Sequence, residues 1–277
     1  GLVRMIRPWN EWLIVWGYDV AQPAPNVDEA MATEVARQLV GDPKLEIELL
    51  SANTWTVNDA YATKLSKGRV FIMGDAAHRH PPSNGLGSNT SIQDAFNLCW
   101  KLASVLKNQA GSTLLETYNT ERAPIAKQVV TRANQSISEF GPIFEALGMT
   151  GGTDYELIKS NMDARCGTDS QAEEQRDALN KAIAFKRYEF DAHGIEMNQR
   201  YSSSAIVCDG QLEPSFEKDA VLHYQPTTWP GARLPHAWVF DASGRKHSTL
   251  DLAGGGTFSL FTGCLLYTSD AADEEAS

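Results

Sequence analysis

The sequence predicts an α/β (α+β) fold, and three consecutive features of the chain carry this prediction. Val70–Met73 is a short apolar run that ends at a glycine, as in a central strand buried on both faces. A loop rich in proline and glycine follows over residues 74–87. Apolar residues then recur at helical spacing beyond Ser88–Thr90, which predicts a long helix. In open α/β sheets, ligands bind where a strand ends and its loop begins.

Upstream of this region, the chain reads as short strands around one helix. The predicted elements are strands at Leu2–Arg7 and Trp12–Tyr18, a helix at Val27–Val40 that ends at Gly41, and strands at Glu46–Leu50 and Thr54–Val57. Trp12, Ile14 and Trp16 share one face of the second strand. Such a stripe is more often plain core than the lining of an aromatic pocket, and both interpretations stay open.

The loop itself has residues that suit a ligand. Gly74 has no side chain, so a ligand can come close to its backbone. Asp75 follows the strand, where a carboxylate can accept hydrogen bonds from sugar hydroxyls, although an Asp here more commonly caps a turn. Pro81–Pro82 make the loop rigid. Gly85 and Gly87 can adopt positive φ and turn main-chain N–H groups toward a ligand.

The helix after the loop is predicted to begin near Ser88–Thr90, where Thr90 and Gln93 have capping-box spacing. It is amphipathic. One face is apolar, with Ile92, Ala95, Phe96, Cys99, Leu102, Ala103 and Leu106, and the other carries Gln93, Asp94, Asn97 and Lys101. A helix N-terminus favours negative charge by ~0.3–2 kcal/mol.

The C-terminal half is predicted to be largely helical before it returns to strands. Thr113 and Glu116 have capping-box spacing, and Pro124 suits the first position of a helix. The predicted elements are a helix from Pro124 to about Phe140, an apolar run at Pro142–Leu147, a helix at Glu173–Phe185, a linker at Tyr224–Gly231, and strands at Trp238–Phe240 and Phe258–Phe261. Gly254–Gly256 would join strands, because no helix with a phosphate-binding lysine follows it.

The strand, loop and helix together resemble the second FAD motif of the single-component flavoprotein aromatic hydroxylases, the family of p-hydroxybenzoate hydroxylase and phenol 2-monooxygenase. The segments that carry the resemblance are Gly74–His78, Pro81–Pro82, Gly85–Thr90 and Ile92–Leu98. Many members have Gly-Gly and Leu-Asn-Thr-Gly in this loop, where this chain has Ser83–Asn84 and Ser88–Ser91. The similarity runs from Gly1 to about Gly263.

The resemblance implies a cofactor site in this loop. The cofactor-binding residues that it implies are Gly74, Asp75, Pro82, Gly85, Gly87, Ser88 and Asn89. Asp75 would bind the ribitol of FAD, and Pro82 would lie beside the reactive edge of the ring. Gly87, Ser88 and Asn89 would face the pyrimidine end with their N–H groups and the helix dipole. Arg79 or His80 would contact a flavin phosphate or the substrate, or else lie in an exposed loop.

The resemblance also implies a reaction. The family reduces FAD with a nicotinamide cofactor, here expected to be NADPH, and adds O2 to form a C4a-hydroperoxyflavin that hydroxylates the carbon ortho to a phenolate. A chlorophenol or simple phenol is the first expected substrate; a hydroxybenzoate, a resorcinol or an antibiotic is the alternative. A flavin reductase and an inactive fragment also stay open. A phenol has a pKa of about 10 and needs a base or favourable charge, and the sequence assigns no catalytic residue to that role.

The same resemblance divides the chain into parts. Residues 1–60 would end a substrate-binding sheet domain, and residues 61–150 would return to the FAD-binding domain. Residues 151–223 would form a helical connector, and residues 224–263 would begin a thioredoxin-like C-terminal domain that is cut short. The chain would thus be the C-terminal part of a p-hydroxybenzoate-hydroxylase-like FAD-binding fold. Arg122 resembles a helix residue of the family and is expected to form a structural ion pair.

Both ends of the chain affect these expectations. The chain begins at Gly1, and no G-x-G-x-x-G dinucleotide motif follows an early strand. We therefore expect the C-terminal part of a longer protein. Cys264–Glu274 resembles the translation of a DNA-sequencing adapter, so residues 264–277 are excluded from the fold as a probable artefact.

Composition narrows the class of protein. The 277 residues are 42% hydrophobic and carry a net charge of −11, which disfavours nucleic acid and anionic membranes as partners. No apolar run reaches the ~20 residues of a membrane span and no signal peptide is present, so a cytoplasmic enzyme is expected. Cys99, Cys166 and Cys208 lack C-x-x-C spacing, which fits unpaired thiols. His78–His80 lacks a third ligand at zinc spacing, so no metal is expected. A homo-oligomer stays open.

Overall fold

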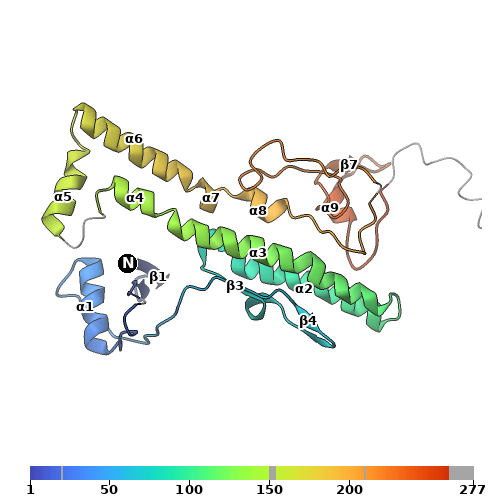
Figure 1. Ribbon diagram of the computed structural model, residues 1–277, viewed down its shortest axis with the longest axis horizontal. Helices are drawn as coiled ribbons and strands as arrows, with labels where there is room; N and C mark the ends of the chain where they lie inside the picture. The colour runs from blue at the N-terminus through green and yellow to red at the C-terminus, as the bar shows by residue number, and fades with distance from the viewer. Residues whose placement is uncertain (20, 150–153, 209, 262–277) are drawn as a thin grey trace, which may run out of the picture. The chain divides into compact units, whose positions relative to one another are not determined.

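The computed structural model describes residues 1–19, 21–149, 154–208 and 210–261 (Figure 1). The glycine pair Gly151–Gly152 predicts a further break after the apolar run at Pro142–Leu147, but it lies outside these residues, as does the adapter-like tail at Cys264–Glu274. The chain divides into two compact units, Gly1–Val57 and Asn58–Ser277. The mixture of helices and strands agrees with the predicted α/β class.

The first unit is a hairpin with one helix. β1 (Leu2–Arg7) and β2 (Glu11–Val15) pair antiparallel, with Leu2 opposite Val15. α1 (Glu29–Val40) begins after Asp28, whose carboxylate accepts the Met31 N–H at 2.8 Å. It ends at Gly41, whose φ of 80° is the left-handed conformation that stops helices. The predicted hairpin and helix are confirmed.

Two strands predicted for this unit are wrong. Glu46–Leu50 and Thr54–Val57 belong to no helix or strand among the described residues. A strand needs a neighbour for its backbone N–H and C=O groups, and a sequence pattern does not supply one. Trp12 is 47% exposed, so the stripe on β2 is not a closed core in this chain.

The second unit is organised around two long helices that a short connection joins. α2 (Leu86–Leu106) and α3 (Glu116–Ser138) are joined by the short turn η3 (Ser112–Leu115) and lie side by side (Figure 1). Two short antiparallel pairs precede α2. They are β3 (Ala60–Tyr61) with β6 (His78–Arg79), and β4 (Ser66–Lys67) with β5 (Val70–Phe71).

The predicted buried strand at Val70–Met73 is corrected by this arrangement. β5 covers only Val70–Phe71, and its one partner among the described residues is β4. Val70 is 65% exposed and Met73 is also exposed. A strand is buried on both faces only where neighbouring strands and covering helices enclose it, and the described residues place none on the open edge of β5.

The starts of α2 and α3 differ from the predicted caps. α2 begins at Leu86, after Gly85 with φ 63°, so Thr90 is a buried helical residue and forms no capping box. Thr113 lies in η3, and α3 begins directly after that turn without a side-chain cap hydrogen bond. Pro124 lies inside α3 rather than at its start. It has no N–H, so α3 lacks one i→i−4 hydrogen bond at this position.

The buried face of α2 is polar rather than apolar. Its buried residues are Leu86, Thr90, Asp94, Asn97, Leu98 and Lys101. Ile92, Phe96 and Leu106, by contrast, are 66%, 76% and 79% exposed. An amphipathic pattern is normally satisfied by burying its apolar side. Here α3 presents Glu121 and Arg122 to α2, and opposite charges bury the polar side instead.

Two small apolar clusters hold the segment between β5 and α2. Leu65, Ala77, Leu98 and Tyr118 form the first. Leu86, Ile125, Val129, Ala192 and Ile195 form the second. Because Ala77 and Leu86 belong to different clusters, the residues between them are fastened at both ends.

The remaining elements are mostly short helices. They are α4 (Gly141–Ala146), α5 (Tyr155–Ala164), α6 (Ser170–Phe185), α7 (Arg187–Phe190), α8 (His193–Met197), β7 (Trp238–Phe240), β8 (Lys246–Ser248) and α9 (Thr249–Leu252). The predicted helix at Glu173–Phe185 and strand at Trp238–Phe240 are confirmed, whereas Phe258–Phe261 forms no strand. Within the described part of the chain, no helix is long and apolar enough to span a bilayer.

Candidate functional site

The candidate site is the loop that leads into α2. It comprises the turn η1 (Gly74–Ala76), β6, the turn η2 (Ser83–Gly85) and the first turn of α2. η1 contacts α2, so the start of the loop lies against the helix that the loop enters. The seven predicted cofactor residues all lie along this loop and the first turn of α2. Gly74 is buried, and the other six are at least partly exposed.

Gly74 is a glycine for a structural reason. Its φ is 57°, and an added Cβ would lie 3.0 Å from Oγ of Ser91 on α2. Its N–H donates to Oδ2 of Asp94 at 3.1 Å. The space that the missing side chain leaves is thus filled by α2, and the close approach predicted for a ligand is made here by the protein itself.

Asp75 and Pro82 are both exposed. Asp75 lies on η1, and its carboxylate accepts no hydrogen bond from any described residue, so its acceptor positions are available. It does not cap the turn through its side chain. This geometry is compatible with the predicted contact to a sugar-like hydroxyl group.

The N-terminus of α2 offers unpaired donors. With Gly85 as the cap, the N–H groups of Leu86, Gly87 and Ser88 have no carbonyl partner within the helix. No side chain of the described residues caps this end of α2. Asn89 lies one residue further along, and its Nδ2 donates to the Gly85 carbonyl at 2.9 Å. Gly87 and Ser88 are therefore better placed than Asn89 to donate to an anionic group.

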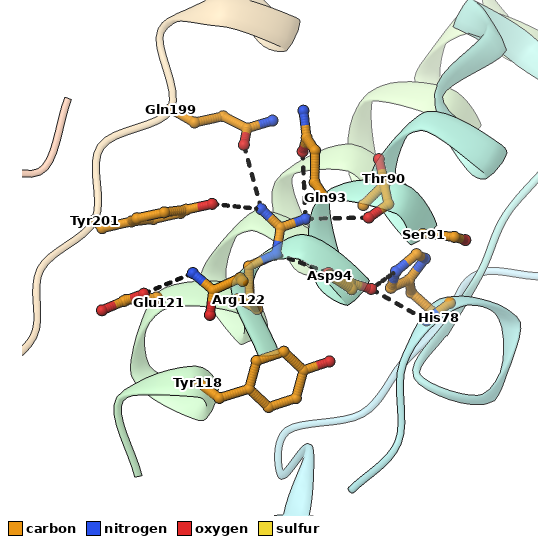
Figure 2. A network of polar contacts seen from close by, with 12 residues as sticks. His78, Thr90, Ser91, Gln93, Asp94, Tyr118, Glu121, Arg122, Gln199 and Tyr201 are labelled. Atoms are coloured by element: carbon orange, nitrogen blue, oxygen red, sulfur yellow. Dashed lines mark hydrogen bonds and ion pairs between the residues drawn. The ribbon is translucent and has the colours of Figure 1, made fainter. Parts of the chain in front are cut away.

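A buried carboxylate fastens the loop to the two helices (Figure 2). Asp94 of α2 is 1% exposed. Its Oδ2 accepts from His78 Nε2 at 2.7 Å as well as from Gly74, and its Oδ1 accepts from Arg122 Nε at 2.7 Å. Gly74, His78, Asp94 and Arg122 are called the Asp94 network below. It joins η1, β6, α2 and α3 at one carboxylate.

Arg122 extends this network to a distant part of the chain. Its Nη1 donates to Tyr201 Oη at 3.0 Å and to Gln199 Oε1 at 3.3 Å. Its Nη2 donates to Gln93 Oε1 at 3.3 Å and to the Thr90 carbonyl at 3.4 Å. The predicted structural ion pair of Arg122 is confirmed, with Asp94 as its partner.

The network keeps Asp94 ionised. Burial alone would raise the pKa of its carboxyl group, but the His78 hydrogen bond, the Arg122 guanidinium and the Gly74 N–H outweigh that effect and lower the pKa. Because a carboxylate only accepts, His78 carries its hydrogen on Nε2. His78 Nδ1 is buried and has no hydrogen-bond partner among the described residues.

A second buried ion pair lies about two turns further along α2. Lys101 Nζ donates to Glu121 Oε2 at 2.6 Å, and Asn97 Nδ2 donates to the same oxygen at 2.7 Å. Ser203 Oγ donates to Glu121 Oε1 at 2.7 Å. Burial would raise the pKa of Glu121, yet these donors together lower it. The two ion pairs make the α2–α3 contact the rigid support of the loop.

An open cavity of about 660 Å³ adjoins the loop. Its lining consists of Pro82, Asn84, Gly85, Glu189, Phe190, Asp191, Ala192, His193, Glu196 and Leu222. Two predicted cofactor residues thus face a segment that the sequence analysis did not connect to the site. That segment carries no recognisable motif, and its proximity depends on a contact between residues about a hundred positions apart.

The sequence does not reveal the role of Asp94 and His78. It predicts Asp94 on the polar face of an amphipathic helix, and it gives His78 only a place in the Gly74–His78 motif and in the His78–His80 segment, for which no metal is expected. One signal was available: Asp94 and Lys101 in α2, like Glu121 and Arg122 in α3, have no i,i+4 partner of opposite sign within their own helix. No group of three metal-ligating side chains occurs in the described ranges.

Comparisons with known proteins agree with the geometry. A family model described as an FAD binding domain matches residues 1–133. The chain is 54% identical over 263 residues to a 2,4-dichlorophenol 6-monooxygenase of Delftia acidovorans, covering 95% of the chain and 45% of that protein. It is 54% identical over 260 residues to a phenol 2-monooxygenase of a Pseudomonas strain, covering 94% of the chain and 43% of that protein.

A solved structure shows a similar fold. The flavin-dependent monooxygenase PieE, crystallised with FAD and substrate, is 41% identical with a TM-score of 0.80. The match covers 92% of this chain and 44% of that one. The chain therefore spans less than half the length of the relatives that it matches. The sequence at Asn84–Ser91 predicts a likeness to 2,4-dichlorophenol 6-monooxygenase. The identities do not test this prediction, because they are 54% both to that protein and to the phenol 2-monooxygenase.

Proposed function

We propose that this chain, which belongs with the single-component FAD-dependent aromatic hydroxylases, supplies half of the FAD site in a phenol ortho-hydroxylase that uses NADPH and O2. The observation that carries the proposal is the 54% identity, along nearly the whole chain, to proteins named for phenol and dichlorophenol hydroxylation. The activity is proposed for a longer protein that contains this chain. Three described cysteines without disulfides are compatible with a cytoplasmic enzyme.

Each loop residue has a proposed role. The exposed carboxylate of Asp75 accepts hydrogen bonds from the ribitol of FAD. The free N–H groups of Gly87 and Ser88, with the α2 dipole, face the pyrimidine edge, where charge accumulates on reduction. Pro82 lies beside the ring, Asn89 steadies the Gly85 carbonyl, and Gly74 holds the loop on α2.

FAD, when bound, supplies the redox and oxygen chemistry of the reaction. The chain's own residues bind and orient it: α2 provides the dipole, and the Asp94 network fixes the loop that surrounds the ring. No described residue is proposed as the base that activates the phenol. We propose a chlorophenol or simple phenol as the substrate, because the 54% identical relatives reported above are named for such compounds.

A larger hydroxylated aromatic is the second candidate. The chain is 32% identical over 256 residues to a tetracenomycin A2 monooxygenase-dioxygenase of Streptomyces glaucescens. Because this identity is lower than the 54% to the phenol and dichlorophenol hydroxylases, the larger aromatic ranks behind simple phenols.

The test is a fusion protein. The part of the Delftia relative that precedes the matched region is joined to residues 1–263 of this chain, and the purified protein is examined for a visible flavin band. NADPH oxidation is then measured with phenol, 2,4-dichlorophenol, a hydroxybenzoate and resorcinol, together with hydroxylated product. Asp75→Ala should weaken FAD binding roughly tenfold or more, as expected for a lost hydrogen bond to a ligand.

The matched control for this variant is Asp59→Ala, an exposed acid outside the loop. A fusion protein that folds without flavin, or that consumes NADPH and releases only peroxide with every phenol, would refute the proposed function. Product from resorcinol or hydroxybenzoate alone would refute the substrate class and leave the reaction class standing.

A further inference from the structure

Asn84 has an unusual backbone for a residue with a side chain. Its φ is 63°, in the left-handed region that favours glycine. Among the described residues, Trp9 and Asn108 are the other non-glycine residues with positive φ. Asn84 lies in η2, between Pro82 and Gly85, at the point where the loop turns into α2. A residue is held in this conformation only when its surroundings favour it.

The side chain of Asn84 forms three hydrogen bonds to two helices that are distant in the sequence. Its Nδ2 donates to the carbonyls of Tyr188 and Glu189 on α7, at 2.7 and 3.2 Å. Its Oδ1 accepts from Ser136 Oγ on α3 at 2.6 Å. Because a main-chain carbonyl only accepts, the two α7 contacts determine which end of the carboxamide is the nitrogen.

The receiving groups are themselves fixed. Ser136 is fully buried, and its Oγ accepts from Arg132 Nη2 at 3.0 Å. Lys186 Nζ donates to the Ser136 carbonyl at 2.7 Å and pairs with Glu189. Arg132 lies 5.5 Å over the ring of Tyr188. The carboxamide of Asn84 therefore meets a prebuilt polar surface formed by α3 and α7.

We propose that Asn84 is a positioning residue that latches the loop Pro82–Gly85 to α3 and α7. The latch fixes the direction in which the chain enters α2, and so the direction in which the N–H groups of Gly87 and Ser88 point. This last step rests on the proposed function, because it concerns the flavin that these groups would face. The latch also closes one wall of the cavity that Pro82, Gly85 and Glu189 line.

A backbone role alone predicts the opposite effect of a glycine substitution. If only the left-handed conformation mattered, Asn84→Gly would relieve strain and leave the loop equally or more ordered. If the carboxamide is the latch, Asn84→Gly keeps the backbone and removes all three hydrogen bonds. Asn108→Gly is the matched control, since Asn108 has φ 56° and is exposed in the turn after α2.

The experiment measures amide hydrogen exchange of the 277-residue chain without flavin. In Asn84→Gly, peptides covering Pro82–Leu86 and Arg187–Asp191 should exchange about tenfold faster, and a peptide from the middle of α3 should not change. Asn108→Gly should leave all three peptides unchanged. Unchanged or slower exchange at both Pro82–Leu86 and Arg187–Asp191 in Asn84→Gly would overturn the proposal.

Two further variants separate the latch from a general loss of structure. Asn84→Asp has the same size and can still accept from Ser136, but it cannot donate to the α7 carbonyls, so it should speed exchange as Asn84→Gly does. Ser136→Ala should have a smaller effect. The double variant Asn84→Gly/Ser136→Ala should exchange little faster than Asn84→Gly alone, because both substitutions remove the same Ser136–Asn84 hydrogen bond. Fully additive effects would contradict the latch.

The flavin-loaded fusion protein provides the functional readout. Asn84→Gly should increase the share of NADPH oxidised without hydroxylated product severalfold, and should shift the flavin absorbance band, while the melting temperature stays close to that of Asn108→Gly. If the unsubstituted protein binds no flavin, the proposed function fails and the exchange result still decides the latch. If flavin binds and Asn84→Gly alters neither spectrum nor coupling, the positioning role fails.

Discussion

The two faces of α2 are opposite in chemistry and reversed in burial. The face toward α3 carries Asp94, Asn97 and Lys101, all buried and all hydrogen-bonded. The other face carries Ile92 and Phe96, which are largely exposed. The difference teaches that periodicity identifies a helix and its faces, whereas the side that is buried depends on what the neighbouring helix offers.

The polar face is buried because each of its charges meets a partner. Buried charges are costly unless they are paired and hydrogen-bonded. Arg122 gives Asp94 a counter-charge, and Glu121 gives Lys101 one. The apolar face is largely exposed and has no comparable buried ion pair among the described residues. Substitutions on the two faces should therefore have very different effects on the free energy of unfolding.

The largest effect is expected when Arg122 is replaced. Arg122→Met leaves the Asp94 carboxylate buried without its counter-charge and should lower the free energy of unfolding by about 3–5 kcal/mol. Urea denaturation measures this directly. In an Asp94→Asn background, the same substitution should cost less, because no buried charge is left behind. An equal cost in both backgrounds would show that Arg122 acts through packing alone.

A smaller contrast is expected at the second ion pair. Glu121→Gln leaves the Lys101 ammonium buried and should destabilise the chain by about 3 kcal/mol, while Lys101→Met with Glu121→Leu together should stay within roughly 1–2 kcal/mol of the original. A double-mutant cycle measures this contrast: urea denaturation of each single variant at Lys101 and Glu121 and of the double variant. A double variant less stable than either single would mean that the pair is net stabilising.

Acid should weaken the contacts of the polar face. The pKa values of Asp94 and Glu121 are lowered below their ordinary values of 3.8 and 4.5. A carboxyl with a depressed pKa contributes stability above its unfolded pKa and loses it as pH falls through the folded pKa. The free energy of unfolding should therefore decrease as the pH is lowered below about 4. The decrease should be less steep in Asp94→Asn than in the original chain. If the free energy of unfolding depends on pH identically in the two proteins, Asp94 does not contribute to the loss of stability in acid.

The smallest effect is expected on the apolar face. Phe96→Ser should change the free energy of unfolding by no more than about 0.5 kcal/mol, since the ring is 76% exposed. It should reduce self-association and dye binding, because exposed apolar surface promotes both. A loss comparable to that of Arg122→Met would show that this face is buried in solution, and would remove the contrast between the two faces.

Much of the fold was predictable from local patterns. The hairpin β1–β2, the helix ended by Gly41 and the helix before Phe185 follow from alternation, spacing and capping residues. Strands that need remote partners were not predictable: Glu46–Leu50 and Phe258–Phe261 have strand-like sequences but no ladder among the described residues. Helix ends were off by a few residues, because Gly85 rather than Thr90 makes the entry to α2.

The position of the candidate site along the chain was predictable from the sequence, but the contacts that support it were not. The loop Gly74–Asn89 was found from its glycines, prolines and helix start. The support beneath it was not found, because Asp94 and Arg122 meet across two helices and Asn84 meets Tyr188 from a distant segment. The assignment of the seven loop residues to FAD stays a prediction.

The Asn84 contacts have a consequence for the order in which the chain folds. Asp94 and Arg122 are 28 positions apart, whereas Asn84 and Tyr188 are 104 apart. Closing the longer stretch costs more entropy, and contacts between remote residues form more slowly. Pulse-labelled exchange during refolding should protect the middle of α2 and α3 before Arg187–Asp191. The loop at Pro82–Gly85 would then take its final shape late, on a helical pair that is already complete.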